Sequence, residues 1–246
     1  QPSKPELWSE GLHPLRAVRR DPWLYGRGSV DDGYGGYLCA TSIRLLQEAG
    51  VSHPRCTLII ETCEESGSFD LPPYLEELTD QLGDPDMVVV MDSGGPDYDH
   101  VWMTEALRGL VSGTLSVKVS HEGIHSGNSG GSIPSSFRIQ RILLDRVEDS
   151  ATGRVLVPEM HVEISQEVRD KAIALRDVVG NSIWEQFPTI DSLRQASETT
   201  EAMIVAMNWE PTLSIIGADG LPSVQVAGNV LRTNTDLKLS FRIPPG

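Results

Sequence analysis

Residues 56–92 read CTLIIETCEESGSFDLPPYLEELTDQLGDPDMVVVMD. Cys56–Ile60 is short, apolar and rich in β-branched residues, a pattern typical of a buried strand. Residues 71–82 have a helical pattern with two prolines in the first turn, where proline is tolerated. Met87–Met91 is a second apolar run of strand length. The order strand, helix, strand predicts a parallel sheet and therefore an α/β fold.

The sequence outside this region predicts further elements of two kinds. A glycine-rich stretch, residues 26–36, leads into a helical pattern over residues 37–49. The pattern then changes near residue 107, so we predict an α/β domain over residues 1–106 and an α+β domain over residues 107–246. In the second domain, we expect strands over residues 110–119, 211–216 and 237–243, a helix over residues 133–147, and mostly helix over residues 165–206.

Composition excludes several classes of protein. The chain has 246 residues, with 35 acidic and 20 basic side chains, and its net charge is −15. This charge argues against a nucleic-acid partner and against binding to an acidic membrane surface. No apolar run reaches the roughly 18 residues that a membrane-spanning helix needs. The three cysteines form no CxxC pair, which fits a reducing compartment, and we therefore expect a cytoplasmic protein.

Acidic residues follow the glycine-rich turn and both apolar runs. In an open α/β sheet, ligands bind beyond the carboxyl ends of the strands, so these acids can converge on one point. Converging carboxylates repel one another, and a pair of metal ions would offset the repulsion. The alternative interpretation is that each acid only caps the next helix or turn. The acids are Asp31, Asp32, Glu61, Glu64, Glu65 and Asp92.

Several segments, in this order, resemble a known enzyme family. Tyr25–Asp32 reads YGRGSVDD and Glu61–Ser68 reads ETCEESGS. They are similar to two motifs of the co-catalytic, di-zinc metallopeptidase and acylase family. This family contains carnosinase-type dipeptidases, glutamate carboxypeptidase, aminoacylase and acetylornithine deacetylase. Weaker similarities follow at Val88–Asp92, Arg108-Gly109, His125-Ser126-Gly127, Asn229-Val230 and Ser240-Phe241-Arg242.

The resemblance implies a fold, an activity and a metal centre. Residues 1–106 would be part of the catalytic α/β domain, and residues 107–246 an α+β, ferredoxin-like lid and dimerisation domain. The implied activity is hydrolysis of amide bonds in dipeptides or N-acyl amino acids. Asp31 would bridge two zinc ions, with manganese or cobalt as possible substitutes, and its peptide bond to Asp32 would be cis. Glu65 would bind one ion and Asp92 the other.

The resemblance also implies roles in the reaction. Glu64 would be the general base that takes a proton from a metal-activated bridging water and passes it to the leaving amine. The family forms homodimers through its lid domain, and His125 would stabilise the oxyanion in the neighbouring subunit. Arg242 would bind the substrate carboxylate, and Asn229 would donate a further hydrogen bond to the substrate.

The chain also departs from the family pattern. It has no His-x-Asp segment before Tyr25 and no histidine near its end, so two of the five expected metal ligands are absent. In addition, Gly33 stands where the family commonly has Lys. We therefore expect a chain truncated at both ends relative to the family. Two alternatives stay open. In the first, the chain is a non-catalytic dimerisation or binding module, or an inactive fragment of such an enzyme. In the second, it is a protein that binds calcium or magnesium through oxygen ligands alone.

Overall fold

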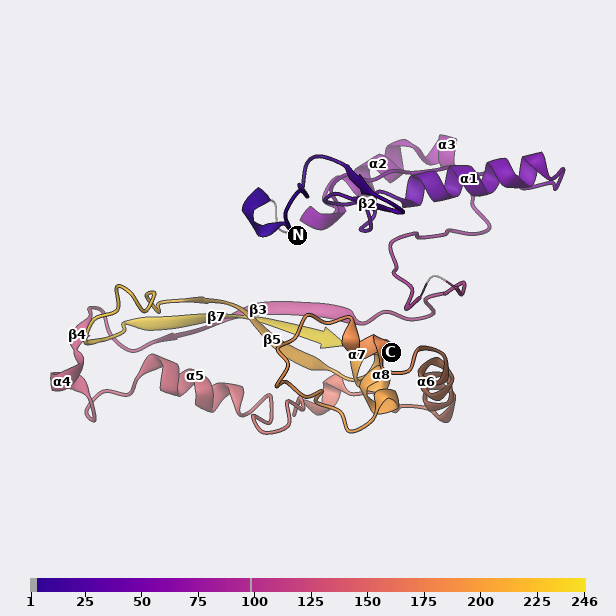
Figure 1. Cartoon of the computed structure of the whole chain (residues 1–246). Helices are drawn as coiled ribbons and strands as arrows, with labels where there is room; N and C mark the ends of the chain where they lie inside the picture. The colour runs from indigo at the N-terminus through magenta and orange to yellow at the C-terminus, as the bar shows by residue number, and fades with distance from the viewer. Residues whose placement is uncertain (1–3, 98) are drawn as a thin grey trace. The chain divides into compact units, whose positions relative to one another are not determined.

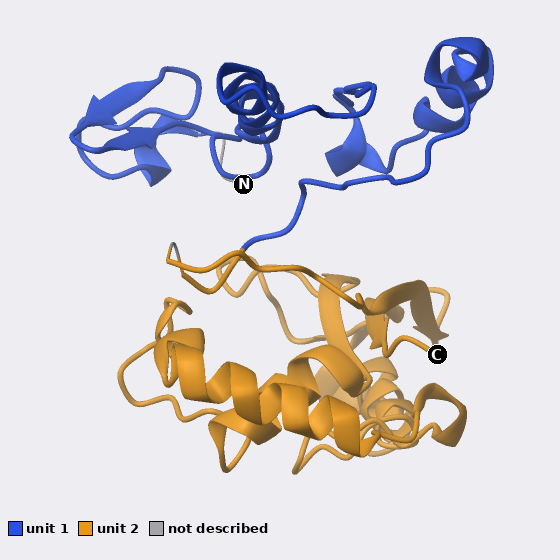
Figure 2. Ribbon diagram, turned by 90° about the vertical axis from the view of Figure 1, so that its right-hand side faces the viewer, with its two compact units in different colours: residues 1–94 blue, residues 95–246 orange. Residues whose placement is uncertain are grey.

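The computed structural model of the chain describes residues 4–97 and 99–246. The chain folds as two compact units, Gln1–Gly94 (unit 1) and Gly95–Gly246 (unit 2), which Figure 2 shows in different colours. The domain boundary predicted after residue 106 stays a prediction. Within the described residues, no helix has the length and apolar character needed to cross a bilayer.

Unit 1 begins with a small hairpin in which β1 (Val18–Arg20) pairs antiparallel with β2 (Trp23–Tyr25). Helix α1 (Gly35–Glu48) follows the glycine-rich stretch (Figure 1) and confirms the helix predicted over residues 37–49. Both elements border the loop that carries the first acidic pair.

The helix predicted over residues 71–82 forms as two shorter helices, α2 (Leu71–Glu77) and α3 (Thr79–Leu82). The Thr79 hydroxyl donates to the carbonyl oxygens of Leu75 and Glu76, at 3.0 and 2.8 Å. Such side-chain hydrogen bonds compete with those of a continuous helix, which explains the break at this point.

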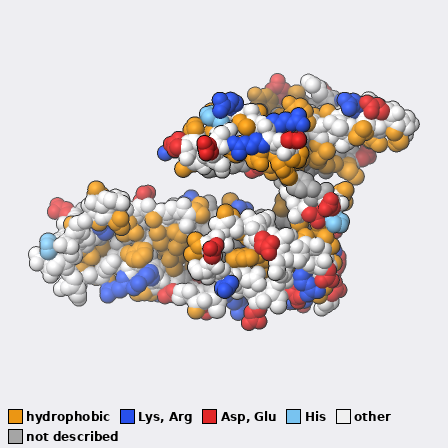
Figure 3. Space-filling view, viewed as in Figure 1, with side chains coloured by type: hydrophobic (Ala, Val, Ile, Leu, Met, Phe, Trp, Pro, Cys, Tyr) orange, Lys and Arg blue, Asp and Glu red, His pale blue; other side chains and the backbone are white. Residues whose placement is uncertain are grey.

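The prediction of two buried strands in unit 1 is wrong. Residues 56–60 and 87–91 form no strand in the structure, and Ile60 and Val88 are 73% and 76% exposed. An apolar run indicates a tendency to be buried, but a strand forms only where a second strand offers hydrogen bonds. Neither segment has such a partner among the described residues. Figure 3 shows hydrophobic side chains on the surface of unit 1.

Unit 2 is built on an antiparallel sheet with the strand order β3-β7-β5. β3 (Gly109–Lys118) pairs along its whole length with β7 (Asn234–Ile243), which also pairs with β5 (Thr212–Asp219). A register shift between Ile215 and Gly217 interrupts the second ladder. All three strands were predicted, the first of them from its alternation of apolar and polar residues.

Helix α5 (Ser136–Leu144) packs on β3 and β7, and it lies within the helix predicted over residues 133–147. Polar side chains take part in its contact with the sheet. The Ser136 hydroxyl and the Thr235 hydroxyl share a hydrogen bond of 2.8 Å in the interior. Gln140, which has no exposed surface, donates its amide N–H groups to the carbonyls of Leu115 and Thr235, at 2.8 and 2.6 Å. Side-chain hydrogen bonds therefore fix this helix against two strands.

The helical part of unit 2 holds its hydrophobic core. Helices α6 (Gln166–Val179), α7 (Ser182–Glu185) and α8 (Thr200–Trp209) occupy the region predicted to be mostly helical. Serine and threonine hydroxyls cap α6 and α8 at Ser165 and Thr199. The buried residues of this core are Ala172, Val179, Ile183, Met203, Ile204 and Val205. Together the two units have the mixture of helix and sheet expected of the predicted fold class.

Candidate active site

The loop between β2 and α1 carries Asp31 and Asp32, and the peptide bond that joins them is cis. The loop is closed by a hydrogen bond from the Gly33 N–H to the Gly28 carbonyl, at 2.7 Å. A Cβ atom on Gly33 would lie 2.6 Å from that carbonyl oxygen. A side chain at this position would therefore require the loop to rearrange.

Glu64 and Glu65 lie in a single turn of 3-10 helix, η2 (Glu64–Ser66). The Gly67 N–H closes the turn on the Glu64 carbonyl, at 2.8 Å. Gly67 has a φ of 101°, in the left-handed region that favours glycine. The Cys63 carbonyl accepts two further backbone hydrogen bonds from the same loop. The Glu64-Glu65 pair is thus held by a dense set of local hydrogen bonds.

The segment that precedes Asp92 lies against the start of α1. The Tyr34 hydroxyl donates to the Met91 carbonyl, at 3.2 Å. A Cβ atom on Gly35 would lie 2.9 Å from Asp32 Oδ1 and 3.2 Å from the Met91 Cβ, so the absence of a side chain at Gly35 permits this close approach. Tyr34 and Gly35 were not predicted as site residues, although both belong to the glycine-rich stretch.

The acidic side chains of these three segments influence one another. Partial desolvation raises the pKa of Glu64, and the charges of Asp92, Glu65 and Asp31 raise it further. Partial desolvation also raises the pKa of Asp92, as do the charges of Asp31 and Asp32 and a hydrogen bond with Asp31. Such effects need short distances. The structure therefore brings together acids that are up to 61 positions apart in the sequence.

The carboxylate groups of these segments fit a divalent cation in charge and in the chemistry of their oxygen atoms. Asp92 and Asp31 share a side-chain hydrogen bond, and the Asp32 Oδ1 atom is buried without a hydrogen-bond partner. Oxygen atoms of this kind are ligands of zinc, manganese and magnesium. Over residues 4–97 and 99–246, no three His, Cys, Asp or Glu side chains are yet arranged closely enough to hold an ion.

In unit 2, His125 and Asn229 lie side by side. β4 (Ile124–His125) pairs with β6 (Val230–Leu231), and the Asn229 carbonyl accepts the Ser126 N–H at 2.9 Å. The Gly127 N–H donates to His125 Nδ1 at 3.1 Å, so in the neutral ring Nε2 carries the proton and can donate it. This is the protonation that an oxyanion-stabilising histidine needs.

Arg242 lies near the other end of the sheet from His125. It faces Leu110 and Thr212 across the ladders, whereas His125 pairs with Val230, just before β7 begins. Eight residues separate Asn234 from Arg242, and at about 3.3 Å per residue they span roughly 26 Å. A dipeptide extends only about 7 Å. His125 and Arg242 of one chain are therefore too far apart to contact the same dipeptide.

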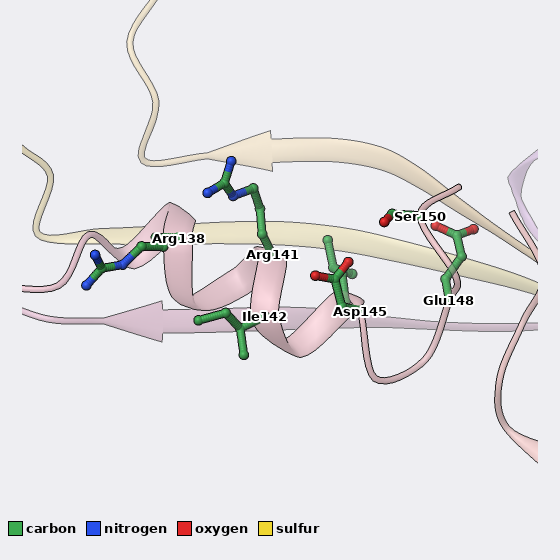
Figure 4. A pocket seen from close by; sticks show the side chains of 7 residues that line it. Arg138, Arg141, Ile142, Asp145, Glu148 and Ser150 are labelled. Atoms are coloured by element: carbon green, nitrogen blue, oxygen red, sulfur yellow. The ribbon is translucent and has the colours of Figure 1, made fainter. Parts of the chain in front are cut away.

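A shallow cavity of about 390 Å³ lies beside α5 and contains none of the predicted site residues. Figure 4 shows Arg138 and Arg141 on α5, with Asp145 and Glu148 farther along the chain. Partial burial raises the pKa of Glu148. The cavity is open and its lining carries both signs of charge, so it indicates no particular ligand.

Comparison with known proteins gives a family match. The profile of "Peptidase family M20/M25/M40" matches residues 1–225. A cysteinylglycine-S-conjugate dipeptidase of Corynebacterium striatum is 23% identical over 98% of this chain and 50% of its own length. A Beta-Ala-His dipeptidase of Mus musculus is 25% identical over 98% of this chain and 49% of its own length.

A solved structure supports the fold. The M20 family metallo-carboxypeptidase Sso-CP2 of Sulfolobus solfataricus superposes with a TM-score of 0.71 at 21% identity, over 100% of this chain and 55% of that one. The chain therefore has the fold of half of such a protein, and it spans about half the length of the curated relatives it matches.

Proposed function

Because the chain belongs to the peptidase family M20/M25/M40, we propose that it carries catalytic and lid residues of a metal-dependent hydrolase that cleaves amide bonds in dipeptides. The observation that carries the proposal is the family match over residues 1–225, and the mutual influence of Asp31, Glu64, Glu65 and Asp92 on their pKa values agrees with it. The names of the two dipeptidase relatives favour dipeptides over N-acyl amino acids as substrates. N-acyl amino acids would also be cleaved at an amide bond.

In this proposal Asp31, Glu65 and Asp92 would hold two metal ions. Zinc is the expected metal, and manganese or cobalt could replace it because carboxylates accept several divalent ions. When bound, the ions supply Lewis acidity and lower the pKa of water toward neutrality. The three carboxylates contribute the negative charge that keeps the ions in place.

Glu64 acts as the general base. The charges of Asp92, Glu65 and Asp31 act on its carboxylate, which supports a proton acceptor next to the proposed metal ligands. It accepts a proton from the water that attacks the scissile carbonyl carbon, and it then gives that proton to the leaving amine. The fixed turn η2 suits this role, because proton transfer in both steps needs one side chain held in place.

The lid residues complete the site in a homodimer. Arg242 binds the free carboxylate of the substrate, and Asn229 donates a hydrogen bond to it. His125 donates from Nε2 to the oxyanion that develops in the partner subunit. The separation of roughly 26 Å between the two ends of β7 supports this arrangement, because His125 and Arg242 can serve one dipeptide only if they come from different subunits.

The variant Glu64→Gln tests the proposal in the native protein. We expect kcat on dipeptides to fall by about 100-fold or more, while zinc content, measured by elemental mass spectrometry, stays unchanged. Glu77→Gln is the matched control, because Glu77 is an exposed residue of α2. Retained turnover in Glu64→Gln would remove Glu64 from the role of base. A native protein that takes up zinc but cleaves no dipeptide would favour the non-catalytic module instead.

A further inference from the structure

Two arginine side chains occupy the same end of one face of the unit 2 sheet. Arg242 on β7 lies opposite Leu110 on β3 and Thr212 on β5. Arg108 precedes Leu110 by two residues. Because side chains of a strand alternate between faces, residues two apart share a face. Arg108 therefore projects from the same face as Arg242.

Arg108 reaches across the end of the sheet. Its Nη1 donates to the Glu210 carbonyl and to the Thr212 hydroxyl, each at 3.3 Å. Both acceptors lie at the β5 side, whereas Arg108 starts at the β3 side. The guanidinium group thus crosses over β7, the strand that carries Arg242. These two bonds orient one edge of the group and leave other N–H donors of its planar fork available.

Neither arginine is neutralised within the described residues. The ion pairs found there involve other basic residues. Glu210 offers Arg108 its backbone carbonyl, and Thr212 offers an uncharged hydroxyl. Burial and the nearby charge of Arg242 both lower the pKa of Arg108, but an arginine stays protonated at neutral pH. In a chain with 35 acidic and only 20 basic residues, two adjacent unneutralised cations point to an anionic ligand.

We propose that Arg108 and Arg242 together form a binding site for a carboxylate, and that Arg108 is a specificity-determining residue that distinguishes a free carboxylate from a neutral amide. The assignment of this carboxylate to a peptide substrate rests on the proposed function. The oriented guanidinium of Arg108 and the exposed one of Arg242 can donate to the two oxygens of one carboxylate. A carboxamide lacks the negative charge and has one acceptor oxygen instead of two.

A titration followed by NMR tests the site without any need for activity. The native protein is labelled with ¹⁵N-arginine, and sodium acetate is added while the Nε–Hε signals are recorded, with sodium chloride at equal ionic strength as reference. We expect the signals of Arg108 and Arg242 to move together with one dissociation constant. Acetamide should move neither signal. Movement of Arg242 alone, or of neither signal, would overturn the proposal.

A kinetic comparison tests the specificity role. Substrates are a dipeptide and the same dipeptide with a carboxamide C-terminus. In Arg108→Met we expect KM for the free dipeptide to rise by roughly 10- to 100-fold, as loss of a charge-assisted hydrogen bond does, and KM for the amide to stay nearly constant. Arg108→Lys, which keeps the charge, should recover part of the loss. Arg141→Met, an exposed change on α5, is the control.

The outcomes of the two tests are distinct. An equal rise of KM for both substrates in Arg108→Met, with a lowered melting temperature, would mean that Arg108 only stabilises the packing of the strands. The proposal would then fail. If the native protein cleaves neither peptide, the proposed function fails, whereas the acetate titration still decides whether the two arginines bind a carboxylate.

Discussion

Glu64 and Asp92 bind protons more tightly in the folded chain than carboxyl groups do in water, since both have raised pKa values. The folded state then holds more protons than the unfolded state, and its stability falls as the pH rises through the raised values. The repulsion among acids that suits this site to cations thus weakens unit 1 when no cation is bound.

We therefore predict a pH effect in metal-free protein. As the pH rises above about 4, where free carboxyl groups titrate, the melting temperature of protein treated with a chelator should fall, and that of Glu64→Gln should fall less. Glu77→Gln removes the same charge from an exposed helix position, and it should behave like the unmodified chain. Differential scanning calorimetry measures all three. Identical pH profiles for Glu64→Gln and Glu77→Gln would contradict the prediction.

The attachment of α5 to the sheet depends on Gln140. Its amide donates two hydrogen bonds to strand carbonyls, while its own carbonyl oxygen is buried without a partner. Gln140→Met keeps most of the volume but leaves two carbonyls without these donors. We predict a loss of about 1–3 kcal/mol in the free energy of unfolding, measured by urea denaturation. Arg141→Met, on the exposed side of α5, should change it by less than about 0.5 kcal/mol. A neutral Gln140→Met would show that the bonds contribute nothing net.

Elements defined by local pattern were predictable from sequence. Alternation identified β3, helical periodicity identified α1 and α5, and the sequence also predicted β5, β7 and the helical region of α6 to α8. Residues 56–60 and 87–91 were not predictable, because pairing depends on a partner elsewhere in the chain and apolar character alone cannot supply it. The break between α2 and α3 depends on hydrogen bonds of one hydroxyl, at Thr79, which leave no pattern in the sequence.

The acidic residues of the candidate site were predictable as a group, because each follows an apolar run or a glycine-rich turn. Their roles stay predictions. In the sequence, Arg108 was noted only together with Gly109, as a weaker similarity to the family. Its position beside Arg242 depends on strand register and on the path of a long side chain across the sheet, and neither can be read from the order of residues.

The two units differ in how well their backbone is protected from proteolysis. The segment that opens unit 2 has exposed apolar side chains, with Val101 94% and Met103 85% exposed. In unit 1, residues 56–60 and 87–91 are also exposed. Strands β3, β5 and β7, by contrast, are joined along nearly their full lengths. Proteases cut where backbone is accessible and few hydrogen bonds hold it.

We predict that brief digestion by a protease selective for apolar residues leaves one resistant fragment that begins between residues 101 and 109 and contains the whole β3-β7-β5 sheet. Mass spectrometry identifies its ends. Unit 1 should be cut first within residues 56–60 and 87–91. Early cleavage inside β3 or β7 would contradict the prediction. An excess of bound zinc should slow the cuts in unit 1, where the proposed ligands lie, and leave those before β3 unchanged.

The position of β7 has a consequence for how the protein is made. β7 is the middle strand of its sheet, yet it follows both neighbours in the chain, and Lys118 of β3 pairs with Asn234, 116 residues later. Chains leave the ribosome from the N-terminus, and such a high contact order slows folding. β3 and β5 must therefore wait, unpaired, until the last strand of the sheet has been synthesised. During that interval they are the segments that a chaperone would have to protect.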